Sequence, residues 1–241
     1  MKSPLRSISI VFLAISIISC GGPGERIKEI SKATPAPSAT PGERELSGVF
    51  NVTGAGTNGI DPYNGVLTVA PKGQNYEFRW ATTKGSLIGT GVQLGTAAAA
   101  SYSATGGGKG CGVVLYKIAS DGSLDGRIAR WGDDKFGTEK AVRTEGTGFV
   151  GKYSVNLTET DGRPFAGTLS ITKDGAGYDF EWNTGSTQVG FGTWKGSTAA
   201  VSFGGKQCSF VLYDIQSNGS FDGTWGGQRS VTFGTESSKR K

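Results

Sequence analysis

The stretch Tyr76-Glu-Phe-Arg-Trp80 returns later in the chain as Tyr178-Asp-Phe-Glu-Trp182. Aromatic residues alternate with charged ones in both, and a period of two places the aromatic rings on one face of a β-strand. Because each ring buries about 150 to 250 Å² in a core, we expect these strands to fill a β-barrel interior. Lining of a ligand pocket is the alternative role for the six rings, Tyr76, Phe78, Trp80, Tyr178, Phe180 and Trp182.

Other segments repeat in the same order, which indicates an internal duplication. The matched pairs are Gly48-Val-Phe-Asn-Val52 with Gly151-Lys-Tyr-Ser-Val155, Gly65-Val-Leu-Thr-Val69 with Gly167-Thr-Leu-Ser-Ile171, Cys111 with Cys208, Val114-Leu-Tyr116 with Val211-Leu-Tyr213, and Phe136-Gly-Thr-Glu139 with Phe233-Gly-Thr-Glu236. The chain from residue 45 onward therefore consists of two copies of one module.

Each copy divides into about eight short runs that alternate apolar and polar residues, separated by turn pairs such as Asn64-Gly65 and Asp174-Gly175. These pairs suit two-residue hairpins, whose central residues need a positive φ. We predict an all-β protein with two tandem antiparallel up-and-down barrel-like modules, at residues 45–143 and 149–237, joined near residues 143–149. One larger merged barrel is the alternative.

The N-terminus is typical of a bacterial lipoprotein signal peptide. Lys2 and Arg6 precede a short apolar run at residues 8–18, which ends at Ile17-Ile-Ser-Cys20. This run is shorter than the roughly 20 residues of a membrane-spanning helix. We expect cleavage after residue 19 and attachment of lipid to Cys20, which would hold the protein to a membrane. Ordinary secretion with an unmodified Cys20 is the alternative.

Two polar segments flank the modules. Residues 20–44 contain Pro23, Pro35, Pro37 and Pro41 and are predicted to form a disordered tether. Residues 238–241 are predicted to form a solvated basic tail. A terminal Lys241 could alternatively be recognised by kringle domains of a host protein, which would make the chain plasminogen-binding.

Composition excludes several kinds of site. The chain contains no histidine, so histidine-dependent catalysis and metal binding are excluded, and we expect no metal, no cofactor and no enzyme activity. Loss of Lys2 and Arg6 with the signal peptide lowers the formal charge from +5 to +3. The remaining charges alternate in sign along the chain, which argues against nucleic-acid binding.

The sequence also predicts the orientation of four acidic residues and the state of two cysteines. Glu77, Asp179, Glu139 and Glu236 are expected to face outward from half-buried sheets, as charges usually do. Cys111 and Cys208 begin runs that are apolar on both strand faces, which suggests burial where the modules meet. We favour two buried free thiols, because a disulfide would require these equivalent positions to lie on a twofold axis with Cα atoms within about 7 Å.

The repeated pattern G-x-[FY]-x-V, G-x-L-x-[IV], Y-x-F-x-W, C-x-x-V-L-Y-x-I and F-G-T-E resembles small repeated domains of spirochaetal, Leptospira-type surface lipoproteins. It covers residues 48–236, and the lipobox with Ile17 is similar to spirochaetal usage. Some relatives in that group are described as fibronectin-binding. The resemblance implies a fold rather than an activity, because the shared residues are mostly glycines and core aromatics.

These observations lead to a functional hypothesis. We expect a non-enzymatic, lipid-anchored protein of the outer membrane, exposed on the cell surface, that acts as an adhesin for a host matrix or plasma protein such as fibronectin or plasminogen. One alternative is a calycin-like barrel that binds a small apolar ligand, which a cavity of at least about 300 Å³ would favour. Another is a periplasmic inhibitor of a cell-wall hydrolase.

Overall fold

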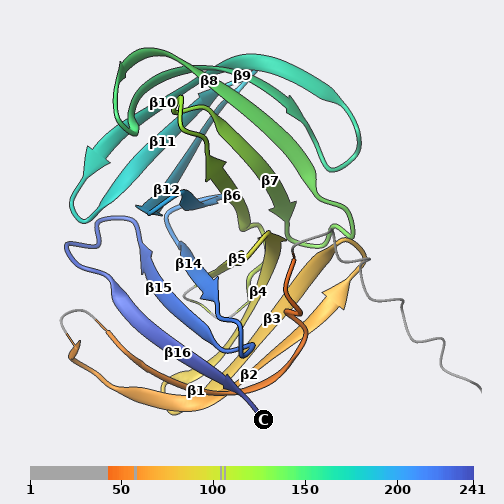
Figure 1. Ribbon diagram of the computed structural model, residues 1–241, viewed down its shortest axis with the longest axis vertical. Coiled ribbons are helices and arrows are strands. Elements are labelled where there is room, and N and C mark those ends of the chain that lie inside the picture. Colours follow the sequence, from red (N-terminus) through yellow and green to blue (C-terminus); the bar gives the residue numbers. More distant parts are fainter. Residues whose placement is uncertain (1–42, 57–58, 104, 106) are drawn as a thin grey trace, which may run out of the picture. The chain divides into compact units, whose positions relative to one another are not determined.

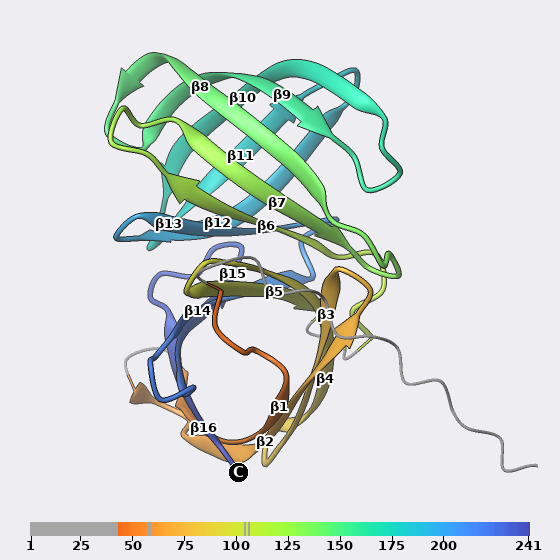
Figure 2. The same cartoon turned by 45° about the vertical axis from the view of Figure 1, so that its right-hand side comes forward.

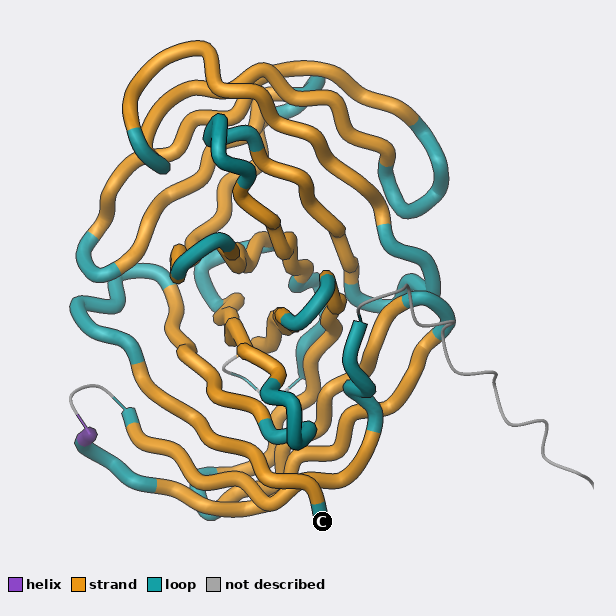
Figure 3. Tube along the Cα trace, in the orientation of Figure 1, coloured by secondary structure: helices purple, strands orange, loops and turns teal. Residues whose placement is uncertain are grey.

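Sixteen β-strands in the described part of the chain form two closed antiparallel barrels of eight strands each (Figures 1 and 3). The computed structural model describes residues 43–56, 59–103, 105 and 107–241. These residues belong to one compact unit, Thr34–Lys241. The predicted signal peptide, the predicted lipidation site Cys20 and all but residues 43 and 44 of the predicted tether lie outside the described residues. The all-β prediction with two eight-stranded barrels is confirmed, and the merged barrel is excluded.

Barrel A joins strands from the two ends of the chain. In order around the barrel they are β1 (Gly48–Ala55), β2 (Tyr63–Lys72), β3 (Asn75–Thr82), β4 (Gly85–Leu94), β5 (Ala97–Ser103), β14 (Cys208–Ile215), β15 (Phe221–Gly227) and β16 (Gly234–Arg240). Barrel B consists of the strands between them: β6 (Gly112–Ile118), β7 (Leu124–Arg130), β8 (Gly137–Thr147), β9 (Val150–Thr158), β10 (Pro164–Asp174), β11 (Gly177–Asn183), β12 (Thr187–Lys195) and β13 (Thr198–Phe203).

The two sequence copies therefore exchange their last three strands. The first copy comprises β1 to β8 and the second β9 to β16, so each barrel takes five strands from one copy and three from the other. The predicted module boundaries, 45–143 and 149–237, are wrong for this reason. Residues 143–149 do not join two barrels; they belong to the β8–β9 hairpin within barrel B. The chain passes between barrels after β5 and again after β13.

The barrels contact each other through apolar outer faces of the strands next to these crossings. Val113 and Leu115 on β6, with Phe210 and Leu212 on β14, belong to a buried cluster that draws on both barrels. The alternate residues of the same strands, Val114 and Val211 among them, lie in the barrel interiors. Figure 2 shows β6 and β13 of barrel B beside β5 of barrel A. Burial of the Cys111 and Cys208 strands on both faces, which the sequence predicts, is confirmed.

Cys111 and Cys208 form a disulfide, with Cα atoms 5.6 Å apart. The preference for two free thiols is wrong, because strand exchange brings equivalent points of the two copies together at the crossing. The disulfide joins the start of β14 to the residue that precedes β6. It therefore links the two barrels as well as the two copies.

The predicted basic tail is also wrong. Residues 238–240 belong to β16, which pairs with β1 and places Arg240 opposite Phe50. The backbone N–H of Lys241 donates a hydrogen bond to the Val49 carbonyl at 2.9 Å. This segment closes barrel A, since without β16 the edge of β1 would have no partner. The side chain of Lys241 remains exposed.

The six predicted aromatic rings lie on β3 and β11. Phe78 and Trp80 are buried in barrel A with Tyr76, and Phe180 and Trp182 are buried in barrel B. Tyr178 is half-buried and packs against the edge of the barrel B core. The period of two in the sequence thus corresponds to inward-facing side chains on both strands.

Candidate functional site

Barrel A contains a cavity of about 630 Å³ at one end. Its mouth lies beside the β1–β2 loop and the β3–β4 turn, where the Lys84 ammonium and the Asp61 carboxylate form an exposed ion pair at 3.3 Å. The walls are mainly apolar and aromatic side chains. They include Ile60, Tyr63, Trp80, Leu87, Tyr102, Val211, Tyr213 and Trp225.

Glu236 on β16 is the one charged side chain buried in the described wall of this cavity, with 6% of its surface exposed. Both of its carboxylate oxygens accept hydrogen bonds. The Tyr63 hydroxyl donates to Oε2 at 2.9 Å, and the Trp80 indole N–H donates to Oε1 at 3.2 Å. The Tyr213 hydroxyl also donates to Oε1. Four strands, β2, β3, β14 and β16, therefore converge on one carboxylate.

Burial raises the pKa of Glu236 above its ordinary value, because the charged form loses its hydration. The hydrogen bonds from Tyr213, Tyr63 and Trp80 act in the opposite direction, since they favour the carboxylate. The rings around it pack in two pairs. Trp80 and Tyr102 have centroids 5.4 Å apart, and Tyr63 and Trp225 have centroids 6.4 Å apart.

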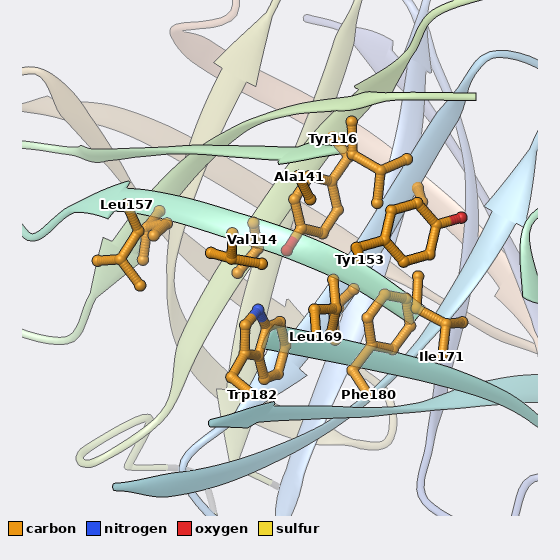
Figure 4. Close-up of a cluster of buried hydrophobic side chains, with 14 of the residues drawn as sticks. Val114, Tyr116, Ala141, Tyr153, Leu157, Leu169, Ile171, Phe180 and Trp182 are labelled. Carbon is orange, nitrogen blue, oxygen red and sulfur yellow. The ribbon is translucent and has the colours of Figure 1, made fainter. Parts of the chain in front are cut away.

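Barrel B repeats the central part of this arrangement. Glu139 is 4% exposed, and its Oε1 accepts hydrogen bonds from the Tyr116 hydroxyl at 2.5 Å and the Trp182 indole N–H at 3.3 Å. In Figure 4 the Tyr116 hydroxyl and the Trp182 nitrogen face the same part of the packed interior. Burial, with a smaller contribution from the nearby Glu159, raises the pKa of Glu139 to about 7. The glutamate, tyrosine and tryptophan are therefore a feature of the repeat.

The corresponding space in barrel B is only about 10 Å³. The residues that face each other across the strands explain part of this difference in volume between the two barrels. Gly54 lies opposite both Glu236 and Tyr63 in barrel A, whereas Leu157 lies opposite Glu139 and Phe165 in barrel B. A Cβ atom on Gly54 would lie 2.3 Å from the Tyr63 ring, so the glycine is what allows that ring to approach.

An ion pair closes the mouth of barrel B. The Arg130 guanidinium donates to both carboxylate oxygens of Glu159, at 2.6 and 2.9 Å, and lies over the Phe203 ring at 4.8 Å from its centroid. Arg130 stands opposite Gly112 in the β6–β7 pair, and Gly227 occupies the equivalent place opposite Ser209 in the β14–β15 pair. Barrel A has no side chain at this position, so its mouth remains open.

Two expectations from the sequence concern the barrel interiors: that aromatic rings fill them, and that Glu139 and Glu236 face outward. The expectation that aromatic rings would fill the interior agrees with barrel B. In barrel A, Gly54 and Gly227 stand where barrel B has Leu157 and Arg130, and a cavity remains.

The expectation that Glu139 and Glu236 face outward is wrong. Both lie in phase with the buried residues Ala141 and Ser238. The sequence does not mark this face as apolar, because Ser238 is polar and the apolar Val142 lies on the exposed face of β8.

The outer acidic residues behave as expected. Glu77 pairs with Arg79 at 2.5 Å near the barrel surface. Asp179 is half-buried on β11, where burial, with a smaller contribution from Asp174, raises its pKa. Neither residue lines the barrel A cavity.

No protein-family model, curated protein or solved structure matches this chain. Within the described residues, no helix has the length and apolar character needed to cross a membrane. The same residues contain no group of three or more His, Cys, Asp or Glu side chains arranged to hold a metal ion.

Proposed function

We propose that this protein is a binding protein whose barrel A takes up a small, mainly apolar ligand. The observation that carries the proposal is the cavity of about 630 Å³, which falls within the roughly 300 to 1,000 Å³ range of ligand pockets. Its wall combines large rings with a few polar groups, and this composition is typical of such sites. Barrel B, whose corresponding space is about 10 Å³, would serve as a support.

Binding fits the cavity better than catalysis. The donor groups that reach Glu236, from Tyr63, Trp80 and Tyr213, are directed at the carboxylate itself. A general acid or base acts on a substrate proton within hydrogen-bond reach, usually together with a second polar group. The other buried or half-buried groups in the described wall that can lose a proton are the hydroxyls of Tyr63, Tyr102 and Tyr213. Burial raises the pKa of all three, so none of them is a base at neutral pH.

The disulfide supports a location outside the cytosol. Structural disulfides persist in oxidising compartments such as the periplasm and the cell surface. Cys111 and Cys208 therefore agree with the secretion that the N-terminal sequence predicts. Lipid attachment to Cys20, an outer-membrane location and surface display remain predictions from the sequence.

Binding of fibronectin or plasminogen likewise remains a prediction from the sequence. The pairing of β16 with β1 changes how it should be tested, because deletion of residues 239–241 would remove the pairs that Lys239 and Arg240 make with β1. Replacement of the exposed Lys241 with Ala would remove a terminal lysine and leave β16 in place. Loss of plasminogen binding in that variant would support recognition of the lysine.

A neutral fluorescent probe tests the proposed pocket directly. Residues 43–241 should enhance the emission of N-phenyl-1-naphthylamine, and titration should give one site per chain. Leu87→Trp should abolish the enhancement, because Leu87 lines the cavity. Gln188→Trp is the matched control, because Gln188 occupies the equivalent position in barrel B and lines its small residual space. Equal probe binding by the two variants, or none by the parent, would refute the proposal.

A further inference from the structure

Barrel B has a partly buried cation, Arg130, at the place where barrel A has its opening, and this side chain also pairs with Glu159. The guanidinium of Arg130 lies over the Phe203 ring and borders the same residual space as Trp182 and Glu139. A cation above an aromatic face is attracted by the ring quadrupole, and the attraction increases when water is excluded. The repeat therefore accommodates an organic cation at this end of its barrel.

Barrel A lacks this cation but has a larger set of polar aromatic rings. Gly227 stands in place of Arg130, while Tyr102 replaces Phe203, Trp225 replaces Ile128 and Tyr63 replaces Phe165. Tyr63, Tyr102 and Trp225 all line the cavity. The difference at Gly227 thus opens the barrel, and the differences at the other three positions supply polar aromatic rings able to contact a cation.

Charge is also unbalanced in the barrel A cavity. Three charged side chains line it, and two of them, Lys84 and Asp61, pair with each other at the exposed mouth. Glu236 has hydrogen-bond donors but no cationic partner among the described residues. A buried carboxylate without a counter-ion is costly, and a ligand of positive charge would reduce that cost.

We propose that the barrel A cavity binds a small organic cation, an amine or guanidine with an apolar body, for which Glu236 is the counter-ion. This inference rests on the ligand-binding function proposed above. The apolar body contacts the rings and Leu87, and the cationic group occupies the side of the cavity near Glu236. An anionic ligand would instead meet the like charge of Glu236.

Three ligands with one phenyl body test the charge preference in the parent protein. Phenethylamine, 2-phenylethanol and phenylacetate are cationic, neutral and anionic at pH 7.5, and calorimetric titration gives their dissociation constants. We expect phenethylamine to bind at least about tenfold more tightly than 2-phenylethanol, a difference of about 1.4 kcal/mol, and phenylacetate to bind most weakly. Equal or reversed affinities would overturn this inference.

Two glutamine variants separate the counter-ion from the pocket. Glu236→Gln keeps an acceptor for Trp80 and Tyr213 but removes the charge, so it should lose the preference for phenethylamine and still bind 2-phenylethanol. Glu139→Gln makes the same change in barrel B and should bind like the parent. Retention of the preference in Glu236→Gln would overturn the inference.

The outcomes also separate the inference from the function on which it rests. If the parent binds the neutral N-phenyl-1-naphthylamine but shows no preference for phenethylamine, the pocket stands and the cation proposal fails. If the parent binds neither the probe nor any of the three phenyl compounds, both proposals fail. The parent measurements need no variant, so a poorly folded Glu236→Gln does not prevent a decision.

Discussion

Cys111 and Cys208 occupy equivalent positions in the two sequence copies and lie within one disulfide of each other, with Cα atoms 5.6 Å apart. They meet where the chain crosses between barrels, so the bond holds the exchanged strands in place. The residues are 97 positions apart in sequence. Cross-linking a segment of that length restricts the unfolded chain strongly in the loop-entropy description.

We expect Cys111→Ser with Cys208→Ser to lower the free energy of unfolding by about 4 kcal/mol. Urea unfolding followed by tryptophan fluorescence measures this change. The parent treated with a reducing agent should behave like the double variant, and the double variant itself should not respond to the agent. Unfolding of the oxidised and reduced parent at the same urea concentration would show that the disulfide does not contribute.

Strand exchange predicts that one sequence copy does not remain monomeric. In the whole chain, Phe210 and Leu212 of the second copy share one buried apolar cluster with Val92, Val113 and Leu115 of the first. Residues 149–241 alone would expose this apolar face, and a second molecule can cover it. We expect this fragment to form a dimer, which light scattering after size-exclusion chromatography detects. Leu212→Lys is a control that should weaken the dimer; a stable monomer of the unchanged fragment would contradict the prediction.

The exchange could not be predicted from the repeats themselves. β5 must pair with a strand of the pattern C-x-x-V-L-Y, and both β6 and β14 belong to such a segment. The local sequence is therefore the same whether a copy closes on itself or on the other copy. The alternation of aromatic and charged residues on β3 and β11 depends only on strand period, and it correctly indicated which rings face inward.

The cavity depends on differences between the copies, whereas the fold depends on what they share. The pairs Gly54 and Leu157, and Gly227 and Arg130, change a small residue to a large one at equivalent barrel positions. A comparison restricted to the conserved motifs does not include them. Their effect on the cavity can be recognised only when the strand registers are known, because Gly54 contacts Tyr63 and Glu236 as a neighbour across the strands.

Gly227→Arg should close barrel A in the way that Arg130 closes barrel B. A Cβ atom on Gly227 would lie 2.9 Å from the Ser209 hydroxyl, which can rotate away, and the backbone at Gly227 does not require a glycine. The new guanidinium would occupy the mouth near Tyr102 and Glu236. We expect affinity for phenethylamine to fall at least about tenfold without loss of thermal stability.

Gly227→Ala controls for the loss of the glycine and should bind phenethylamine like the parent. Calorimetric titration of both variants gives the comparison. Unchanged affinity in a folded Gly227→Arg would indicate that the amine binds elsewhere. Measuring the affinity of the parent for phenethylamine at increasing sodium chloride concentrations is a further check. Salt should weaken binding at the buried Glu236 less than it would weaken binding at a surface carboxylate.

The buried Glu139 should make the free energy of unfolding depend on pH, and Glu139→Gln should remove this dependence. Its pKa is raised by burial from an ordinary value of 4.5 to about 7 in the folded protein. Between these values the folded state binds more protons than the unfolded state at this residue, so its contribution to stability falls as pH rises. The total change approaches about 3 kcal/mol from pH 4 to pH 8, and it should be nearly complete above pH 7.

Glu139→Gln cannot lose a proton, yet its amide oxygen can still accept hydrogen bonds from Tyr116 and Trp182. The variant should therefore gain stability relative to the parent as pH rises from 5 to 8, because only the parent must ionise a buried carboxyl. Comparing the two proteins at each pH cancels the titration of the exposed carboxylates, which they share. Urea unfolding at pH 5, 6, 7 and 8 measures the difference. A difference that stays constant over this range would mean that Glu139 titrates with an ordinary pKa despite its burial.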